Sequence, residues 1–438
     1  MKKKILSFVC VFSLLVCFAL TACSSQSAAG IWGAKINDNG ELVLIYHNGA
    51  EQNLGVVVGK DGVDGTDGKD GSVTVDSGAG GVSLASAKGL RSAVSIVCKF
   101  QANILQGGWR PGSGSTTTKS YSSGGSGVIY QLNKAEGDAF IITNHHVVYD
   151  ASSNTENGIS NDISVYLYGS ASEANAIKAT YVGGSLYYDI AVLRVENSEL
   201  LKNSDACAVG VTDSDTIAVG DTALAIGNAK GYGISVSSGI VSVDSEYITM
   251  TASDERTEVS FRVMRVDAAI NSGNSGGGLF DAGGNLIGIV NAKIVADGVE
   301  NIGYAIPSNV AVAIADNIID YCYGTDTERV QRAMLGITVN ASGSKAVYNA
   351  ETGRMTIEET VSVDEVSKGS LAEGVLKEGD IFLSMTLAGE KSDITRQYQV
   401  IDLMLDVRVG DVVKLNILRN GENRTVEIAI TEDCLTAY

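Results

Sequence analysis

Ser275 stands in the sequence Gly-Asn-Ser-Gly-Gly, residues 273–277, where small neighbours let a carbonyl group approach a serine hydroxyl. Such a run also leaves backbone N–H groups free to point at one spot, as an oxyanion site requires. Two histidines, His145 and His146, follow the apolar segment 140–143, and a histidine held at the end of a buried strand suits general-base catalysis. Asp189 opens another apolar segment, where a half-buried carboxylate can hydrogen-bond an imidazole. These residue types predict acyl transfer by a serine nucleophile.

The elements around these residues are predicted to be strands. From about residue 89 to 324, short β-branched runs alternate with Gly, Ser, Asn and Asp turns, which is typical of a barrel or a sandwich. A helix is expected over 310–321, and the Gly/Ser/Thr-rich segment 106–125 is expected to be a loop. The predicted strands include 93–97, 140–143, 163–167, 190–193 and 286–290.

Residues 330–432 are predicted to form a separate small domain. Two strands, 412–418 and 425–430, flank Asn420-Gly421, a dipeptide that favours a tight hairpin turn. A helix is expected over 393–407.

Several motifs in the same order resemble those of the HtrA (DegP-like) serine proteases, over roughly residues 85–432. Residues 143–147, Thr-Asn-His-His-Val, are similar to the family's Thr-Asn-x-His-Val, and residues 189–193 resemble its Asp-Leu-Ala-Val-Leu. The run 273–277 resembles the family's nucleophile loop, and residues 126–129, Ser-Gly-Val-Ile, match its early strand. The chain order His, Asp, Ser is also that of chymotrypsin-like enzymes.

The resemblance implies a mainly-β protein in which a chymotrypsin-like double β-barrel precedes a small α+β domain. It selects His146 as the base, Asp189 as its orienting acid and Ser275 as the nucleophile, with the N–H groups of Gly273 and Ser275 binding the oxyanion. Family members assemble as trimers, so a homotrimer is expected here.

The residues before Ser275 predict the specificity of cleavage. Ala269, six residues before Ser275, and Ile270 provide no carboxylate for a Lys or Arg side chain. Ile302 and Tyr304 are expected to form the opposite wall. The sequence therefore predicts cleavage after small aliphatic residues such as Val, Ala or Ile.

The C-terminal domain resembles a PDZ domain. Met334, Leu335, Gly336 and Ile337 match the loop with which PDZ domains bind a peptide carboxylate through free N–H groups. The helix near 393–407 would form the other wall of the groove. The alternative is a small β domain that serves only as a scaffold.

The N-terminal region is predicted to target and tether the protein. Three lysines and an apolar stretch of residues 5–20 precede Leu-Thr-Ala-Cys, which resembles a bacterial lipobox with Cys23 as the lipidated residue. An ordinary signal peptide is the alternative. A hairpin is expected from strands 41–46 and 53–58. Residues 59–71 carry glycine at every third position, so they form either a polar spacer or a weak three-chain zipper.

Composition narrows the class of partner. The net charge of -19 argues against binding of nucleic acid.

Beyond the signal and the lipidation site, Cys98, Cys207, Cys322 and Cys434 form no Cys-x-x-Cys pair, so no metal or other cofactor is expected. Free thiols are the simpler reading, although a disulfide stays open.

These features predict an extracytoplasmic, lipid-anchored serine endopeptidase that cleaves misfolded or unassembled proteins. One alternative is a non-proteolytic chaperone or PDZ binding module on a protease fold. Another is a processing or signalling protease with one substrate. The expected regions are a signal peptide over 1–22, a tether with hairpin and collagen-like spacer over 23–83, a trypsin-like domain over 84–324 and a PDZ domain over 330–432.

Overall fold

The computed structural model describes residues 31–56, 79–106, 115–292 and 302–437, apart from Asp38, Gly40, His47, Asn48, Glu156 and Ala171. The chain forms two compact units, Met1–Thr74 and Val75–Tyr438. The predicted signal peptide with Cys23 and the glycine-repeat segment 59–71 lie outside the described residues. No helix in the described ranges is long and apolar enough to cross a membrane.

The first unit contains a three-stranded antiparallel sheet, in the order β1-β2-β3. The predicted hairpin is confirmed as β2 paired with β3, although β3 begins two residues before the predicted position 53. The strand β1 was not predicted. It pairs with β2 and adds the third strand that a lone hairpin needs for stability in water. The strands are β1 (Ile31–Ile36), β2 (Glu41–Tyr46) and β3 (Glu51–Val56).

The second unit begins with a closed barrel in the order β4-β5-β6-β9-β8-β7. Its interior is apolar, and Ile96, Ile129 and Leu193 have no exposed surface. The four strands predicted within this barrel are present. The strands are β4 (Ala93–Gln106), β5 (Ser115–Asn133), β6 (Asp138–Thr143), β7 (Asp162–Leu167), β8 (Ile177–Ser185) and β9 (Ile190–Val195).

The predicted loop over 106–125 is wrong for residues 115–125. These residues begin β5, which pairs with β4 continuously from Ser115 opposite Gln106 to Val128 opposite Ala93. Because this segment is rich in serine and glycine, its sequence does not indicate a strand. Its backbone N–H and C=O groups find their hydrogen-bond partners in the neighbouring strand β4. Residues 116–118 are threonines, whose β-branched side chains favour extended backbone.

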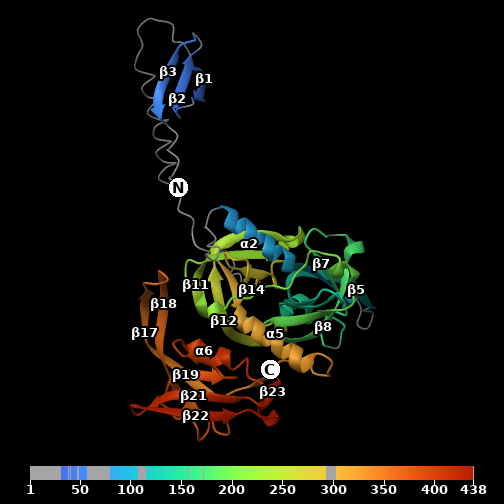
Figure 1. The fold of residues 1–438 in the computed structure, drawn as a ribbon. Coiled ribbons are helices and arrows are strands. Elements are labelled where there is room, and N and C mark those ends of the chain that lie inside the picture. Colours follow the sequence, from blue (N-terminus) through green and yellow to red (C-terminus); the bar gives the residue numbers. More distant parts are fainter. Residues whose placement is uncertain are drawn as a thin grey trace. The chain divides into compact units, whose positions relative to one another are not determined.

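A second closed barrel follows, in the order β10-β11-β12-β15-β14-β13. The two barrels lie side by side, with β5, β7 and β8 on the right and β11, β12 and β14 on the left (Figure 1). The two closed barrels confirm the double-barrel prediction. The strands are β10 (Thr222–Gly227), β11 (Ser235–Thr251), β12 (Glu258–Val266), β13 (Gly278–Phe280), β14 (Leu286–Val290) and β15 (Gly303–Pro307).

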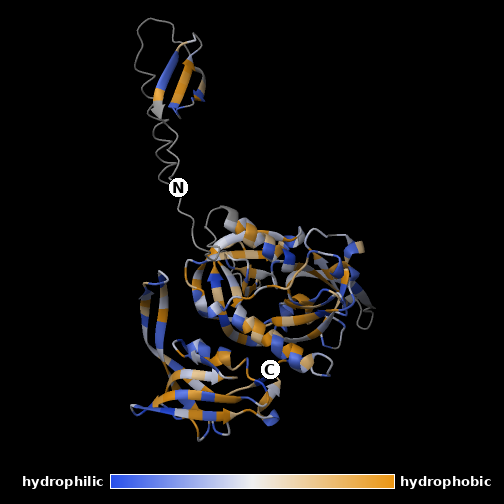
Figure 2. Cartoon of the chain, in the orientation of Figure 1, coloured by the Kyte–Doolittle hydropathy of each residue, from blue (hydrophilic) through white to orange (hydrophobic). Residues whose placement is uncertain are grey.

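In the described part of the double barrel there are four α-helices. Helix α5 (Ser308–Cys322) covers the predicted 310–321 and buries Val310, Ile314 and Ile318, which share one face at a spacing of four residues. Figure 2 shows hydrophobic and hydrophilic bands along this helix. Helix α2 (Ala79–Ser92) was not predicted, and the predicted domain start at residue 84 falls inside it. The two short helices are α3 (His145–Val148) and α4 (Glu199–Lys202).

The C-terminal domain is built on a sheet in the order β17-β18-β19-β21-β22, with β20 paired to β19. The hairpin around Asn420-Gly421 is confirmed, because β21 pairs with β22 across this turn. The helix predicted over 393–407 is shorter, since residues up to Asp393 pair with β19 as strand β20. The elements are β16 (Gln331–Ala333), β17 (Ile337–Asn349), β18 (Arg354–Val366), β19 (Ile381–Leu387), β20 (Glu390–Asp393), α6 (Gln397–Leu403), β21 (Val412–Arg419), β22 (Glu422–Ala429) and β23 (Leu435–Ala437).

The four cysteines in the second unit are free thiols. Cys98 and Cys322 are buried, whereas Cys207 and Cys434 are partly exposed. The disulfide that the sequence left open is absent from the described residues.

Candidate active site

The loop that carries Ser275 is a tight turn between β12 and β13. The N–H of Asn274 donates to the carbonyl of Asn271 at 3.0 Å, and Gly273, the third residue of this turn, has a φ of 96°. A positive φ at that position defines a type II turn, which favours glycine. A Cβ at Gly273 would lie 2.3 Å from the carbonyl oxygen of Asn228. The turn therefore needs glycine for both its backbone conformation and its close packing.

Two backbone N–H groups beside Ser275 are unused. Among the described residues, the N–H of Gly273 and that of Ser275 donate to no protein group. The carbonyl of Ser272 accepts from the N–H of Lys230 at 2.7 Å. Because N–H and C=O point in opposite directions across a trans peptide, this bond directs the Gly273 N–H away from Lys230. The loop thus has two free donors next to a serine hydroxyl.

His146 and Asp189 are paired. Asp189 follows the strand β8 and has a φ of 54°, and His146 lies in the single turn of α3 after β6. One carboxylate oxygen accepts from the His146 backbone N–H at 2.9 Å, and the other lies 2.6 Å from His146 Nδ1. An ionised carboxylate only accepts hydrogen bonds, so Nδ1 carries the proton and Nε2 is left as the base.

Asp189 is held in its ionised form. Its side chain is buried, and burial opposes ionisation. The electrostatic attraction and the hydrogen bonds of His146 outweigh burial and hold the pKa of this carboxyl below its ordinary value.

Sequence reasoning missed Asn291, which follows β14 in the second barrel. Its Nδ2 donates to Asp189 Oδ2 at 2.8 Å, and the residue is 1% exposed. Asn144 Nδ2 donates to the backbone carbonyl of Asp189 at 2.9 Å. The signal for Asn291 was a polar residue directly after the apolar segment 286–290.

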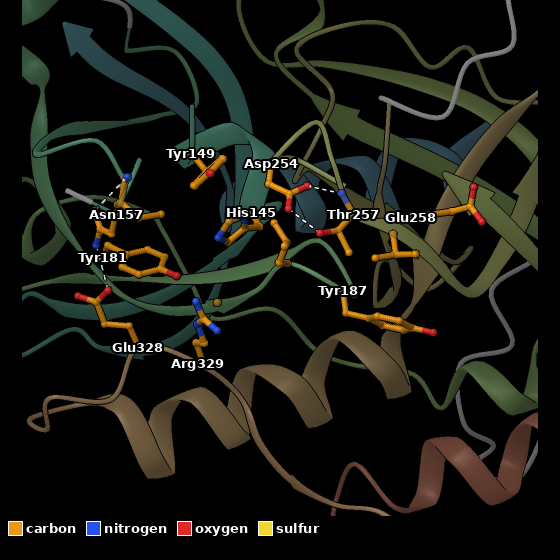
Figure 3. A pocket seen from close by; sticks show the side chains of 14 residues that line it. His145, Tyr149, Asn157, Tyr181, Tyr187, Asp254, Thr257, Glu258, Glu328 and Arg329 are labelled. Atoms are coloured by element: carbon orange, nitrogen blue, oxygen red, sulfur yellow. Dashed lines mark hydrogen bonds between the residues drawn. The ribbon is translucent and has the colours of Figure 1, made fainter. Parts of the chain in front are cut away.

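The neighbouring His145 has different surroundings. Its ring stacks on Tyr149 with centroids 5.0 Å apart, and its Nδ1 lies 2.8 Å from Ser253 Oγ. It faces a cavity of about 550 Å³, which Tyr181 and Glu328 also line (Figure 3). Among the hydrogen bonds of the described residues, the imidazole that bonds the Asp189 side chain is that of His146.

Ser275 is not hydrogen-bonded to His146. Of the hydrogen bonds between described residues, none joins Ser275 Oγ to the imidazole. The structure therefore brings together His146, Asp189 and Asn291, and it separately forms the loop with Ser275 and its free N–H groups.

The chain is similar to a known family of peptidases. Residues 125–289 match the family model described as the trypsin-like peptidase domain. The chain is 32% identical over 351 residues to the serine protease Do-like HtrA of Bacillus subtilis (strain 168), covering 78% of this chain and 71% of that protein. This chain belongs to the HtrA family of serine proteases. It is an enzyme, a trypsin-like serine protease of the HtrA/DegP type.

Two further relatives extend the match. The periplasmic pH-dependent serine endoprotease DegQ of Escherichia coli (strain K12) is 32% identical over 309 residues, which are 70% of this chain and 59% of DegQ. The solved structure of the HtrA-type protease AlgW with a tripeptide has a TM-score of 0.50 and 27% identity, covering 82% of this chain and 98% of that chain.

The residues predicted to form the specificity pocket of this HtrA protease lie partly together. Ile270 packs on Gly303, where an added Cβ would lie 2.4 Å from Ile270 Cδ1. Ile302 and Tyr304, on either side of Gly303, are half-buried. Ala269 is exposed, and its carbonyl accepts from Ser237 Oγ at 2.8 Å.

The predicted carboxylate loop lines a groove in the C-terminal domain of this HtrA protease. Within the described part of the chain, the N–H groups of Met334, Leu335 and Gly336 donate to no protein group. The groove holds about 410 Å³ between this loop with β17 on one side and α6 on the other. Tyr187 and Tyr188 of the first barrel also line it, which the sequence did not indicate.

Proposed function

We propose that Ser275, His146 and Asp189 are the catalytic triad of this HtrA protease. The observation that carries the proposal is the double contact of Asp189 with His146, at the backbone N–H and at Nδ1. That contact fixes both the orientation and the tautomer of the imidazole, which a general base needs before it can accept a proton.

In the proposed reaction, His146 Nε2 takes the proton of Ser275 as its hydroxyl attacks the scissile carbonyl. The imidazolium that forms is stabilised by Asp189, which stays ionised. The carbonyl oxygen becomes an oxyanion that the N–H groups of Gly273 and Ser275 bind, and each such donor is typically worth about 10²–10³ in turnover. His146 then returns the proton to the leaving amine, and water hydrolyses the acyl-enzyme by the same route in reverse.

Fluorophosphonate labelling and casein digestion by the full chain test the triad. Wild type is expected to be labelled and to digest casein, and Ser275→Ala is expected to do neither. The absence of labelling in wild type, with peptide ligands present as well as absent, would refute the proposed triad.

We infer a preference for small aliphatic residues before the scissile bond. The support is Ile270, which fills space against Gly303, and the lack of a carboxylate at positions 269 and 270. The nearest acid upstream of Ser275 is Asp267, whose Oδ1 already accepts from the Ile240 N–H at 2.6 Å. A peptide library should give cleavage after Val, Ala or Ile. A profile dominated by cleavage after Arg would overturn the inference.

We also propose that residues 330–432 are a PDZ domain that binds the C-termini of polypeptides. Support comes from the unused N–H groups of Met334, Leu335 and Gly336 beside an apolar groove. A fluorescent peptide with a free, apolar C-terminus should bind Ser275→Ala protein at least 10-fold more tightly than its C-terminal amide. Equal affinity would favour the scaffold alternative.

The remaining parts of the proposal concern place and assembly. We propose an extracytoplasmic protein anchored by a lipid on Cys23, acting as a homotrimer on misfolded or unassembled proteins. The name of the periplasmic relative and the lipobox-like sequence support this place. Labelled palmitate should enter wild type but not Cys23→Ala.

Light scattering with and without residues 31–74 tests whether the glycine-repeat segment contributes to the trimer.

A further inference from the structure

Ser126 of the first barrel contacts the loop that carries Ser275. It lies on β5 and has no exposed surface. Its Oγ donates to the carbonyl of Gly273 at 2.7 Å and accepts from the N–H of Asn228 at 2.7 Å. One hydroxyl therefore joins two loops of the second barrel to a strand of the first.

The main chain of Ser126 makes two more bonds at the same place. Its N–H donates to the carbonyl of Ser275 at 2.8 Å. Its own carbonyl accepts from Thr143 Oγ1 at 2.7 Å, which ties Ser126 to the end of β6 just before the histidines. Ser126 thus binds the carbonyls of Gly273 and Ser275, the two residues whose N–H groups form the proposed oxyanion site.

Anchoring these carbonyls restricts the direction of the N–H groups. Gly273 has no side chain, so its φ and ψ are limited mainly by the contacts of its backbone. Three bonds hold the peptides on either side of it. The Lys230 N–H donates to the carbonyl of Ser272, the Asn274 N–H donates to the carbonyl of Asn271, and Ser126 Oγ donates to the carbonyl of Gly273 itself. Losing the Ser126 bond leaves the Gly273–Asn274 peptide with one anchor, so it can tilt and shift the adjoining Gly273 N–H from its direction.

The surroundings leave no substitute for the hydroxyl. A Cβ at Gly227 would lie 2.9 Å from Ser126 Oγ, and one at Gly277 would lie 3.2 Å from Ser126 Cβ. Without the hydroxyl, the half-buried carbonyl of Gly273 and N–H of Asn228 would both lose this partner in a space packed by glycine backbone.

We propose that Ser126 is a positioning residue for the oxyanion site and acts through Gly273 and Ser275. The inference rests on the proposed role of Ser275 as nucleophile. Ser126 does not touch substrate. Its loss is therefore expected to weaken binding of the transition state while leaving binding of substrate nearly unchanged.

The test compares Ser126→Ala with Ser308→Ala in the full chain. Ser308 is a matched control, because it is equally buried and its Oγ donates to a backbone carbonyl, that of Thr212, at 2.7 Å, on the N-terminal turn of α5. Ser126→Ala should lower kcat by about 10–100-fold, less than the 10²–10³ for complete loss of an oxyanion donor, with KM within about 3-fold. Affinity for a peptide boronate, which forms a tetrahedral adduct with the nucleophile, should fall by the same factor as kcat/KM.

The control separates positioning from general stability. Ser308→Ala should lower Tm by a similar amount and keep kcat and boronate affinity within about 2-fold. The proposal is overturned if Ser126→Ala lowers Tm but retains wild-type kcat and boronate affinity. If Ser126→Ala does not fold, Ser126→Cys, whose thiol is a weak donor, is expected to show the same pattern to a smaller extent. An inactive wild type would instead refute the proposed triad.

Discussion

At the scale of single residues, neighbours in the chain are given different roles by what they touch. His145 and His146 are adjacent, yet one bonds Ser253 and stacks on Tyr149 while the other bonds the Asp189 carboxylate. A general base needs a partner that fixes its tautomer, and the ionised Asp189 carboxylate does this for His146. The two histidine side chains are chemically identical, so their different surroundings decide which of them can act as a general base.

Replacing each histidine should separate these roles. His146→Ala is expected to lower kcat by about 10⁴-fold or more, because the base is lost. His145→Asn is expected to keep kcat within about 10-fold and to lower Tm, because a buried hydrogen bond and a ring contact are removed. Steady-state cleavage of one fluorogenic peptide measures the kcat of both variants. A larger loss from His145→Asn than from His146→Ala would reverse the assignment.

Asn291 is predicted to contribute through Asp189. A hydrogen bond to a charged group is worth about 1.5–3 kcal/mol, so Asn291→Ala should lower kcat by about 10–100-fold. Asn317→Ala is a suitable control, because Asn317 is also 1% exposed and its Nδ2 donates to the carbonyl of Gln331 at 2.6 Å. The control should lose stability and keep its kcat. Equal kcat values for the two variants would exclude a role for Asn291.

At the scale of elements, turns and pairing partners decide where strands begin and end. Asn420 and Gly421 both have positive φ, 52° and 81°, which is the backbone of a type I′ turn between β21 and β22. By contrast, nothing within the glycine-rich part of β5 marks it as a strand. That strand depends on β4 alongside it.

The turn between β21 and β22 gives a quantitative prediction. Gly421→Ala should lower the free energy of unfolding by about 1–2 kcal/mol, since a Cβ is disfavoured at this φ although the space around Gly421 is open. Asn420→Gly should change it by less than about 0.5 kcal/mol. Urea denaturation of both variants measures their free energies of unfolding. An unaffected Gly421→Ala protein would mean that the turn relaxes without cost.

At the scale of the whole second unit, a buried arginine links the second barrel to the C-terminal domain. Arg262 on β12 lies 3.2 Å from Asp215 and 2.8 Å from Asp402 on α6, and its guanidinium covers the Tyr398 ring at 3.8 Å. Asp402 Oδ2 accepts no aligned hydrogen bond. Burial raises the pKa of Asp402 to about 6, since Arg262 is shared with Asp215 and offsets burial only in part.

This arrangement predicts a pH dependence of stability. The pKa of Asp402 is higher in the folded than in the unfolded chain, so the folded state binds this proton more tightly. The contribution of Asp402 to the free energy of unfolding should fall by roughly 1–3 kcal/mol as pH rises from about 4 to about 6. Above pH 6 it should stay level.

The variant Asp402→Asn isolates that contribution. The difference in Tm between wild type and Asp402→Asn should shift in favour of the variant as pH rises from 4 to 7. Asp364→Asn, an exposed position on β18, should show no such shift. A difference that does not depend on pH would contradict the raised pKa.

The sequence by itself determined the parts of this protein that follow from local pattern. Apolar runs with turn residues between them located most barrel strands, because alternation and turn chemistry are properties of neighbouring residues. Ser275, His146 and Asp189 could be proposed as a triad because their residue types and order suggest a mechanism, and the resemblance to the HtrA motifs chose His146 over His145. Asn420-Gly421 located its turn for the same local reason.

Only the tertiary structure decided which groups meet across the barrels. Asn291 and Ser126 contact Asp189 and Gly273 from distant parts of the chain, and no local pattern encodes those partners. Helix α2 contains glycines that weaken any helical signal, and Gly89 allows close packing, with an added Cβ only 2.5 Å from Ile226. Packing of this kind supplies most helical stability in folded proteins. Long-range contacts therefore set the positions of the groups whose types the sequence had already identified.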